Sequence, residues 1–315
     1  MKRRAVVALE SGGTKLVASL TDERGEVLDH LRVARPVTNQ AAQTLRQLIG
    51  MGRALRQRWE GEGWQVEGLG FGFGGLVRRC RQEAYLCLHE HGWEHVDARR
   101  ELEGVFGVPV FIENDCKVAA LAEAKRGAGR GAESVFYATI GTGVGGGFVV
   151  GGRIQSLHDG GEAEIGHLCA EVGGPLCGCG GRGCIEALCS GPGMWALGRH
   201  RFENAQAIFG AWEQGDAEAT EIVERCAGHM ARALGAVMAL LHPRRIVLGG
   251  GVASGNPKYV DRIRELTTDR VVSYFRPEFD LRVAELGELV VSQGAALFAL
   301  AQMEQRRSEP CLVVN

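Results

Sequence analysis

The residues best suited to chemistry lie in one short stretch, which has the spacing His167-x9-Cys177-x-Cys179-x4-Cys184. Three cysteines within eight residues, surrounded by glycines, leave no room for a helix or for the core of a strand. One imidazole and three thiolates suit a tetrahedral zinc ion, so the sequence predicts a structural zinc site. Cys169 is a rival to His167 for one ligand position, and the competing interpretation is a glycine-rich loop with buried free thiols.

Two glycine-rich turns are candidates for holding phosphate groups. One contains Gly12, Gly13, Thr14 and Lys15, and the other reads Gly141-Thr142-Gly143 followed by four more residues of which three are glycine. Successive backbone N–H groups in such a turn form an anion-binding nest. Neither turn opens a helix directly, so neither is a P-loop or a dinucleotide fingerprint. An ordinary hairpin also needs such a turn, but a matching pair favours a phosphate ligand.

Three acidic residues stand where a ligand site could use them. Asp115 follows Asn114 at the end of an apolar strand, which is the edge of an α/β sheet where ligands bind. Its competing role is to cap the helix that follows. Glu164 and Glu186 flank the cysteine cluster, and two carboxylates beside a metal-braced loop favour polar site groups over solvated ones.

The elements that must position these residues repeat along the chain. We expect strands at 5–9, 15–20, 26–33, 66–73 and 108–113, with helices at 38–59, capped by Thr38, and 117–126. The same series of strand, glycine turn, strand, turn and strand returns at 135–156, and such an echo suggests two similar domains. Further helices are expected at 218–241, 257–269 and about 292–306, and a strand at 245–248.

This pattern predicts an α/β protein with two domains. We expect an N-terminal domain over 1–115, with the helix at about 292–306 packing back on it, and a C-terminal domain over 116–291 that carries the zinc loop.

Composition narrows the class of protein. The chain has 315 residues, 45% of them hydrophobic and 23% charged, which is ordinary for a globular protein. A net charge of −2 argues against nucleic acid or an anionic membrane as a partner. Glu10 and Lys15 interrupt the first apolar run, so no secretory signal is predicted. We therefore expect a cytoplasmic protein whose ten cysteines are thiols or metal ligands.

With these motifs in place, the chain resembles the ROK family of sugar kinases, which are relatives of hexokinase and actin. The resemblance rests on five segments in the family's order, and it covers most of the chain: 12–15, 113–120, 140–147, 164–186 and 247–251. It implies an actin-like ATPase fold of the ribonuclease H-like type, with two domains and a central cleft for nucleotide and sugar.

The resemblance also implies roles for individual residues. Asp115 would be the general base, and the sugar would be bound by Gly75, His89, Asn114, Asp115, Glu164, His167 and Glu186. ATP would be bound by Gly12, Gly13, Thr14, Lys15, Gly141, Thr142, Gly143, Gly250 and Gly251. The implied cofactors are structural Zn2+ on His167, Cys177, Cys179 and Cys184, and Mg2+ with ATP. By analogy the protein would be a homodimer or a homotetramer.

The expected activity is transfer of a phosphoryl group from ATP to a hexose, in the manner of a glucokinase acting on the 6-hydroxyl. Two departures keep a fructokinase or an N-acetylhexosamine kinase open: Glu10 replaces the family's usual Asp, and His89 stands where aldohexose kinases carry an Asn.

Three classes of protein compete with a sugar kinase: a non-catalytic sugar sensor, a repressor and a zinc-ribbon nucleic-acid binder. The repressor is disfavoured because the first phosphate motif starts at Glu10, which leaves no space for a preceding DNA-binding domain. The zinc ribbon is disfavoured because it needs two distant ligand pairs. The sensor stays open, since Glu10 and the absent Asn could weaken catalysis while sugar binding persists.

Overall fold

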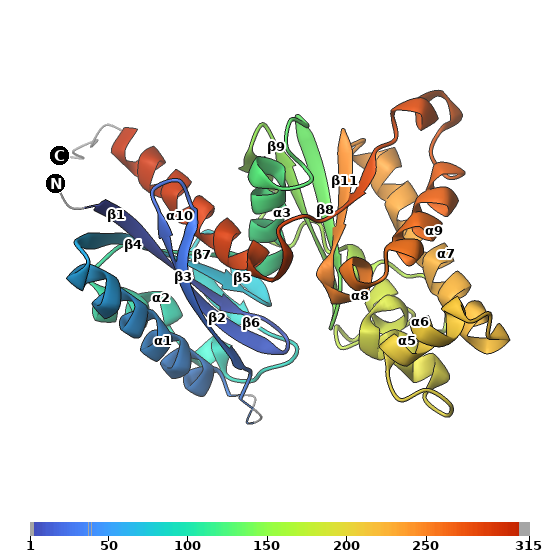
Figure 1. Cartoon of the computed structure of the whole chain (residues 1–315), viewed down its shortest axis with the longest axis horizontal. Coiled ribbons are helices and arrows are strands. Elements are labelled where there is room, and N and C mark those ends of the chain that lie inside the picture. Colours follow the sequence, from blue (N-terminus) through green and yellow to red (C-terminus); the bar gives the residue numbers. More distant parts are fainter. Residues whose placement is uncertain (1–2, 37, 39, 309–315) are drawn as a thin grey trace. The chain divides into compact units, whose positions relative to one another are not determined.

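Figure 1 shows the computed structural model, which describes residues 3–36, 38 and 40–308. The chain forms two compact units. The first unit runs to Ala122 and also includes Ser156–Gly161 and the chain from Glu288 onward. The second unit comprises Glu123–Gln155 and Glu162–Gly287. The first unit thus extends seven residues beyond position 115, and it contains a short segment from the middle of the chain.

The first unit is built on a five-stranded sheet with the order β3-β2-β1-β4-β7. The strands are β1 (Arg3–Ser11), β2 (Lys15–Asp22), β3 (Val27–Ala34), β4 (Trp64–Phe73) and β7 (Val110–Asn114). β1 pairs antiparallel with β2 and parallel with β4, and β4 pairs parallel with β7. The carboxyl ends of β1, β4 and β7 therefore meet at one edge of the sheet, which is where ligands bind in such sheets.

Helices cover both faces of this sheet, as Figure 1 shows. Leu69, Phe71 and Phe73 of β4 belong to the core that includes α1 (Ala41–Gly61) and α2 (Ala98–Phe106). The alternate residues of β4 are glycines that face α10 (Val290–Ser308). A Cβ on Gly70 would lie 2.1 Å from the carbonyl oxygen of Ala295, so only glycine allows this close packing.

Three smaller elements complete the first unit. β5 (Leu76–Arg78) and β6 (Glu83–Leu86) form a hairpin, and the 3-10 helix η1 (Trp93–His95) follows. The helix α3 (Asp115–Arg126) begins in this unit directly after β7. The segment Ser156–Gly161 is fixed here, because the buried Lys117 donates from Nζ to the carbonyl oxygen of Gly160 at 2.6 Å.

The sheet of the second unit repeats this arrangement, with the order β10-β9-β8-β11-β12. The strands are β8 (Ser134–Ile140), β9 (Val144–Val150), β10 (Arg153–Ile154), β11 (Arg245–Gly249) and β12 (Leu281–Val283). β9 pairs antiparallel with both β8 and β10, whereas β11 pairs parallel with β8 and β12. The two sheets thus share one topology, which is the duplication that the sequence echo predicts.

Most helices of the second unit lie in the chain between β10 and β12. They are α4 (Ile185–Cys189), α5 (Gly191–Gly198), α6 (Ala205–Glu213), α7 (Ala217–Leu240), α8 (Gly250–Gly255) and α9 (Pro257–Thr268), with 3-10 helices η2 (Ile165–His167) and η3 (Ser273–Glu278). A last 3-10 helix, η4 (Gly287–Leu289), stands just before α10. The buried face of α7 includes Met230 and Leu234, which pack in one core with Leu248 of β11. Among the described residues, every helix is too short or too polar to cross a bilayer.

Two helix starts differ from the sequence prediction. α1 begins at Ala41 with Gln40 at the cap position, and Thr38 instead donates from Oγ1 to Gln43 Oε1. The prediction of Thr38 as the cap was wrong, because this threonine bonds a side chain of the first turn and no backbone N–H. α3 begins at Asp115 and is capped by Asn114, whose Oδ1 accepts from the backbone N–H of Lys117 at 3.1 Å.

Candidate active site

Asn114 and Asp115 stand where β7 ends and α3 begins, at the sheet edge of the first unit. Asn114 supplies the helix cap and also donates from Nδ2 to the carbonyl oxygen of Gly75 at 3.1 Å. Asp115 is half-buried, and a Cβ on Gly74 would lie 3.3 Å from its Oδ2. Asp115 Oδ1 accepts from the backbone N–H of Cys116 at 2.8 Å, so its carboxylate is held at the first turn of α3, beside Gly74.

The first glycine turn joins β1 to β2 at the same edge of the first sheet. It is closed by a hydrogen bond from the backbone N–H of Gly12 to the carbonyl oxygen of Lys15 at 3.0 Å. Gly13 and Thr14 are exposed at its tip. The Lys15 ammonium donates to the carbonyl oxygen of Glu288 at 2.6 Å and lies 3.5 Å from Glu10 Oε1. The turn therefore presents exposed backbone and one cation beside a buried acid.

Glu10 is a buried carboxyl group at this edge with a raised pKa. Burial raises its pKa to about 7 from the usual 4.5, and the nearby charge of Lys15 opposes that rise. The carboxylate of Asp115 raises the pKa of Glu10 further, so the two acids influence each other. The replacement of Asp by Glu at position 10 thus places a carboxyl group that titrates near neutral pH beside Asp115.

Not every expected sugar contact of the first unit is buried at this edge. His89 is exposed on the loop between β6 and η1, although its neighbours Cys87 and Glu90 are buried. The Cys87 thiol lies 3.2 Å from the carbonyl oxygen of Gly74 and donates to it. The loop that carries His89 is thereby joined to the glycine pair next to Asp115.

The second glycine turn joins β8 to β9 in the second unit. Glu186 accepts at Oε2 from the backbone N–H of Val144 at 3.0 Å, immediately after the turn. A Cβ on Gly143 would lie 2.5 Å from that same oxygen, so glycine makes room for the carboxylate. Thr142 is exposed at the tip of the turn. The structure therefore places a sequence-predicted sugar residue against a sequence-predicted phosphate turn.

A third glycine segment meets this turn at the end of β11. Gly250 has a φ of +84°, and a Cβ there would lie 2.4 Å from Thr139 Oγ1, so the position requires glycine twice over. A Cβ on Gly141 would lie 3.7 Å from the backbone nitrogen of Gly251, which places the two segments side by side. The predicted nucleotide residues of the second unit thus gather at one sheet edge.

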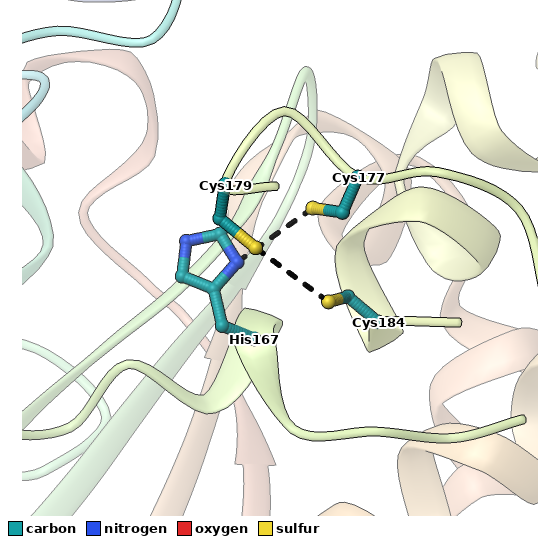
Figure 2. Close-up of side chains that lie close together, drawn as sticks. All are labelled: His167, Cys177, Cys179 and Cys184. Atoms are coloured by element: carbon teal, nitrogen blue, oxygen red, sulfur yellow. Dashed lines mark hydrogen bonds between the residues drawn. The ribbon is translucent and has the colours of Figure 1, made fainter. Parts of the chain in front are cut away.

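The four predicted zinc ligands converge in the second unit, as Figure 2 shows. Their ligand atoms all lie within 4.8 Å of one another. Cys179 Sγ lies 3.7 Å from Cys184 Sγ, and His167 Nδ1 lies 3.8 Å from Cys177 Sγ. Zinc–sulfur bonds of about 2.3 Å in a tetrahedron would separate two sulfur atoms by about 3.8 Å. The donor set and its spacing therefore fit zinc.

Burial opposes ionisation of two of the three clustered thiols. Burial raises the pKa of Cys177 and raises that of Cys184 to about 12, whereas the backbone N–H of Gly181 lowers the pKa of Cys179. Three thiolates this close repel one another, and a bound dication removes that repulsion. Cys169, the rival ligand, is exposed and lies outside the cluster, with its Sγ 3.8 Å from the carbonyl oxygen of Arg182.

His167 and Glu186 connect the zinc cluster to the polar groups around it. With Nδ1 directed at the cysteines, His167 Nε2 lies 3.9 Å from Glu164 Oε2. Cys177 Sγ lies 3.9 Å from Glu186 Oε1. Glu164 thus borders the ring of His167, and Glu186 borders Cys177. A metal at the cysteines would fix the orientation of the histidine ring.

Sequence reasoning missed the clamp that holds this loop to α7. Glu171 lies inside the loop, and Arg225 donates to both of its carboxylate oxygens at 2.7 Å. His229 Nε2 lies 2.7 Å from Glu171 Oε1, and Arg225 helps to lower the pKa of Glu171 to about 2. A carboxylate four residues after His167 was a signal, but partners 54 and 58 residues away are not visible in the sequence.

Comparisons with known proteins show the family of this chain. The model of the ROK family matches residues 6–302. The N-acetylmannosamine kinase of Escherichia coli is 31% identical over 303 residues, which cover 92% of this chain and 99% of that protein. A ROK hexokinase structure from Thermus thermophilus is similar with a TM-score of 0.82 and 33% identity, covering 96% of this chain and 99% of that one. A ROK glucokinase from Streptomyces griseus, in complex with glucose and AMPPNP, gives 0.81 and 28%, covering 94% and 99%.

Proposed function

This chain belongs to the ROK family, and from that premise we propose that it phosphorylates the 6-hydroxyl of a hexose, with Asp115 as the general base. The relatives, and the solved complex with glucose and AMPPNP, support an ATP-dependent sugar kinase with the actin-like ATPase fold. The observation that carries the finer proposal is the position of Asp115 directly after β7, at the carboxyl edge of the first sheet and beside the Gly74-Gly75 pair.

In the proposed reaction, Asp115 accepts the proton of the sugar hydroxyl as that oxygen attacks the γ-phosphorus. The bond from the γ-phosphorus to the bridging oxygen breaks, and ADP leaves. Such a transition state is loose, so positioning and charge neutralisation contribute more than base strength. Asn114 helps to hold Asp115 in this position. The Asn114 side chain caps the start of α3 and also donates a hydrogen bond to the carbonyl oxygen of Gly75.

The glycine turns supply the donor side of the proposal. Gly12 and Gly141 close the two turns, since their N–H groups donate to the carbonyl oxygens of Lys15 and Gly143. Gly13, Thr14 and Lys15 of the first turn, and Thr142 and Gly143 of the second, would supply N–H groups, hydroxyls and one ammonium to phosphate oxygens. Gly250 and Gly251 open α8 and are proposed to contact the adenosine. Mg2+ bound with ATP would neutralise charge on the phosphates.

The zinc loop supplies part of the acceptor side. Zinc on His167, Cys177, Cys179 and Cys184 would hold the loop in one shape. Glu164, Glu186 and the Nε2 edge of His167 would then accept or donate hydrogen bonds to sugar hydroxyls. The role of the metal is structural, since all four coordination positions are filled by the protein and none is left for a reacting group.

Glucose is the proposed acceptor, and an N-acetylhexosamine is the second candidate. The E. coli relative named N-acetylmannosamine kinase, at 31% identity, favours the second candidate. His89 in place of the Asn that aldohexose kinases carry leaves the choice to the loop before η1, and a ketose stays in the panel because of Glu10. A non-catalytic sensor would not need Asp115 and both glycine turns, which this chain retains.

We further propose a cytoplasmic homodimer or homotetramer. A reducing compartment keeps the three thiols of the zinc loop available to the metal, and it is where ATP is supplied. Nucleic acid and membrane are not proposed as partners, since the chain carries a net charge of −2.

The proposal is tested by an assay of sugar-dependent ADP release. Glucose, mannose, fructose, N-acetylglucosamine and N-acetylmannosamine are compared with ATP and Mg2+, and 31P NMR of the product identifies the phosphorylated hydroxyl. Asp115→Asn should lower kcat by about 100- to 10,000-fold, because a general base contributes that much, while sugars still raise the melting temperature. The matched control is Glu94→Gln, an exposed acid of the same unit. If sugars stabilise the wild type but none is turned over, the protein is a sensor and not a kinase.

A further inference from the structure

A buried ion pair lies beside the loop that carries His89. Arg35 follows β3 directly and donates from Nη2 to Glu90 Oε2 at 2.8 Å, and the exposed fractions of the two side chains are 6% and 0%. A pair this buried loses most of what it gains, because both charges give up their hydration. Its presence is better explained by what it holds in place than by added stability.

Glu90 holds the loop from three directions. Besides Arg35, it accepts hydrogen bonds from Thr44 Oγ1 of α1 and from Trp93 Nε1 of η1, the latter at 2.6 Å. The donors come from three different parts of the unit, and the carboxylate lies at the point where they meet. We call residues 86–91, which are the last residue of β6 and the loop after it, the acceptor loop. This segment cannot shift without breaking charge-assisted hydrogen bonds.

Arg35 joins this loop to the first glycine turn. The same Nη2 that bonds Glu90 lies 3.0 Å from Ser11 Oγ, at the end of β1. The backbone N–H of Arg35 donates to the carbonyl oxygen of Thr14 at 3.0 Å. Arg35 thus contacts both sides of the turn proposed to bind phosphate. It also contacts Glu90, the acid that anchors the acceptor loop.

The acceptor loop in turn touches the residues around Asp115. Cys87 donates from Sγ to the carbonyl oxygen of Gly74 at 3.2 Å. A Cβ on Gly75 would lie 2.3 Å from the carbonyl oxygen of Leu86, so loop and glycine pair are in tight contact. Asn114 donates to the carbonyl oxygen of Gly75, so a displacement of the loop would also displace Asn114, the neighbour of the proposed base Asp115.

We propose that Arg35 and Glu90 are positioning residues that set the sugar specificity of this enzyme. They hold the acceptor loop so that His89 and Gly75 meet the sugar in one geometry, without touching the sugar themselves. Arg35 also couples that geometry to the phosphate turn. This inference rests on the proposed function, and it concerns which acceptor is used and how well, rather than whether phosphoryl transfer occurs.

The test compares three variants on the same sugar panel. Glu90→Gln removes the negative charge and with it the ion pair to Arg35, and the amide NH2 cannot accept from one of the present donors. We therefore expect KM for the preferred sugar to rise about 5- to 50-fold while KM for ATP stays within about twofold. In Arg35→Lys both KM values should rise, because the shorter and more flexible Lys does not hold a nitrogen where Nη2 contacts Ser11 and Glu90 together. The ratio of kcat/KM between glucose and N-acetylmannosamine should shift in both variants. Arg35→Met/Glu90→Gln removes both charges, and it replaces any single variant that does not fold.

The matched control is Glu67→Gln, which removes a carboxylate that pairs with Arg4 at 2.7 Å near the other end of β1. It should leave both KM values and the sugar ratio unchanged. Folded Glu90 variants with unchanged sugar KM and unchanged sugar ratio would overturn the inference. A general loss of stability would instead change the KM for sugar and the KM for ATP together.

Hydrogen–deuterium exchange keeps this inference separate from the proposed function. In Glu90→Gln, peptides covering residues 86–93 should exchange faster than in the wild type, whereas peptides of β1 and the zinc loop should not. Unchanged exchange in 86–93 would overturn the positioning role even if the kinase is active. A wild type that turns over no sugar would overturn the proposed function, while the exchange experiment still decides whether the pair holds the loop.

Discussion

The carboxylate of Glu186 bonds the backbone N–H of Val144 at 3.0 Å, and this contact joins the zinc loop to the second glycine turn. One oxygen of Glu186 is used at the turn, while the other lies 3.9 Å from Cys177 Sγ. A residue proposed to bind sugar is therefore also part of the framework of a turn proposed to bind phosphate.

Glu186→Ala should impair both substrates at once. Loss of a hydrogen bond to a charged group is typically worth about 1.5–3 kcal/mol, so we expect KM for sugar and for ATP each to rise on the order of tenfold or more. Initial-rate kinetics with each substrate varied in turn measure this. Glu203→Ala, an exposed glutamate of the same unit, is the control. A change confined to the sugar KM would show that the turn does not depend on Glu186.

Gly143→Ala approaches the same contact from the other side. The new Cβ would lie 2.5 Å from Glu186 Oε2, so the carboxylate must move away and release Val144. We expect KM for ATP to rise about tenfold with the protein still folded. Gly210→Ala, in α6 with no atom within 4 Å of the added carbon, should instead stabilise the protein slightly. Wild-type ATP kinetics in Gly143→Ala would contradict the proposed use of this turn.

Cys179→Ser should remove the zinc and weaken sugar binding together. A loop that shifts by about 1 Å can cost on the order of 100-fold, so the sugar KM should rise by about 10- to 100-fold. Metal content is measured by mass spectrometry and the melting temperature by calorimetry. Cys169→Ser, outside the cluster, should keep one zinc per chain and normal kinetics. Purified wild-type protein without zinc would refute the metal assignment.

Glu10 predicts a pH-dependent stability. Its pKa is about 7 in the folded chain against 4.5 when unfolded, so the folded state holds a proton that the unfolded state releases first. The stability from this group is complete below about pH 4.5 and is lost as pH rises through about 7, a loss of about 3 kcal/mol. Glu10→Gln should therefore raise the melting temperature at pH 8 and hardly change it at pH 5. Glu23→Gln, on an exposed turn, provides the baseline. Equal effects at both pH values would contradict the shift.

The features that the sequence predicts well depend on residues close together in the chain. The spacing of His167, Cys177, Cys179 and Cys184 predicts their convergence, because few other structures need three cysteines among glycines. The glycine turns are also local, and the recurrence of strand order in the two sheets follows from their repeated pattern.

The remaining features depend on long-range pairing. Arg35 and Glu90 are 55 residues apart, and each alone reads as an ordinary surface charge. Helix starts depend on which side chain reaches a backbone N–H first. Asn114 rather than Asp115 caps α3, and Thr38 bonds Gln43 while α1 begins without a side-chain cap. Propensity cannot decide between two neighbouring residues that can both fill one role.

The glycine row of β4 has a consequence for how the protein is made. Gly68, Gly70 and Gly72 receive α10, whose residues leave the ribosome only after the whole second unit has been synthesised. At about 5–20 residues per second, that delay is on the order of ten seconds. Until then α10 does not cover the glycine row of β4, so the unit that is translated first is completed last.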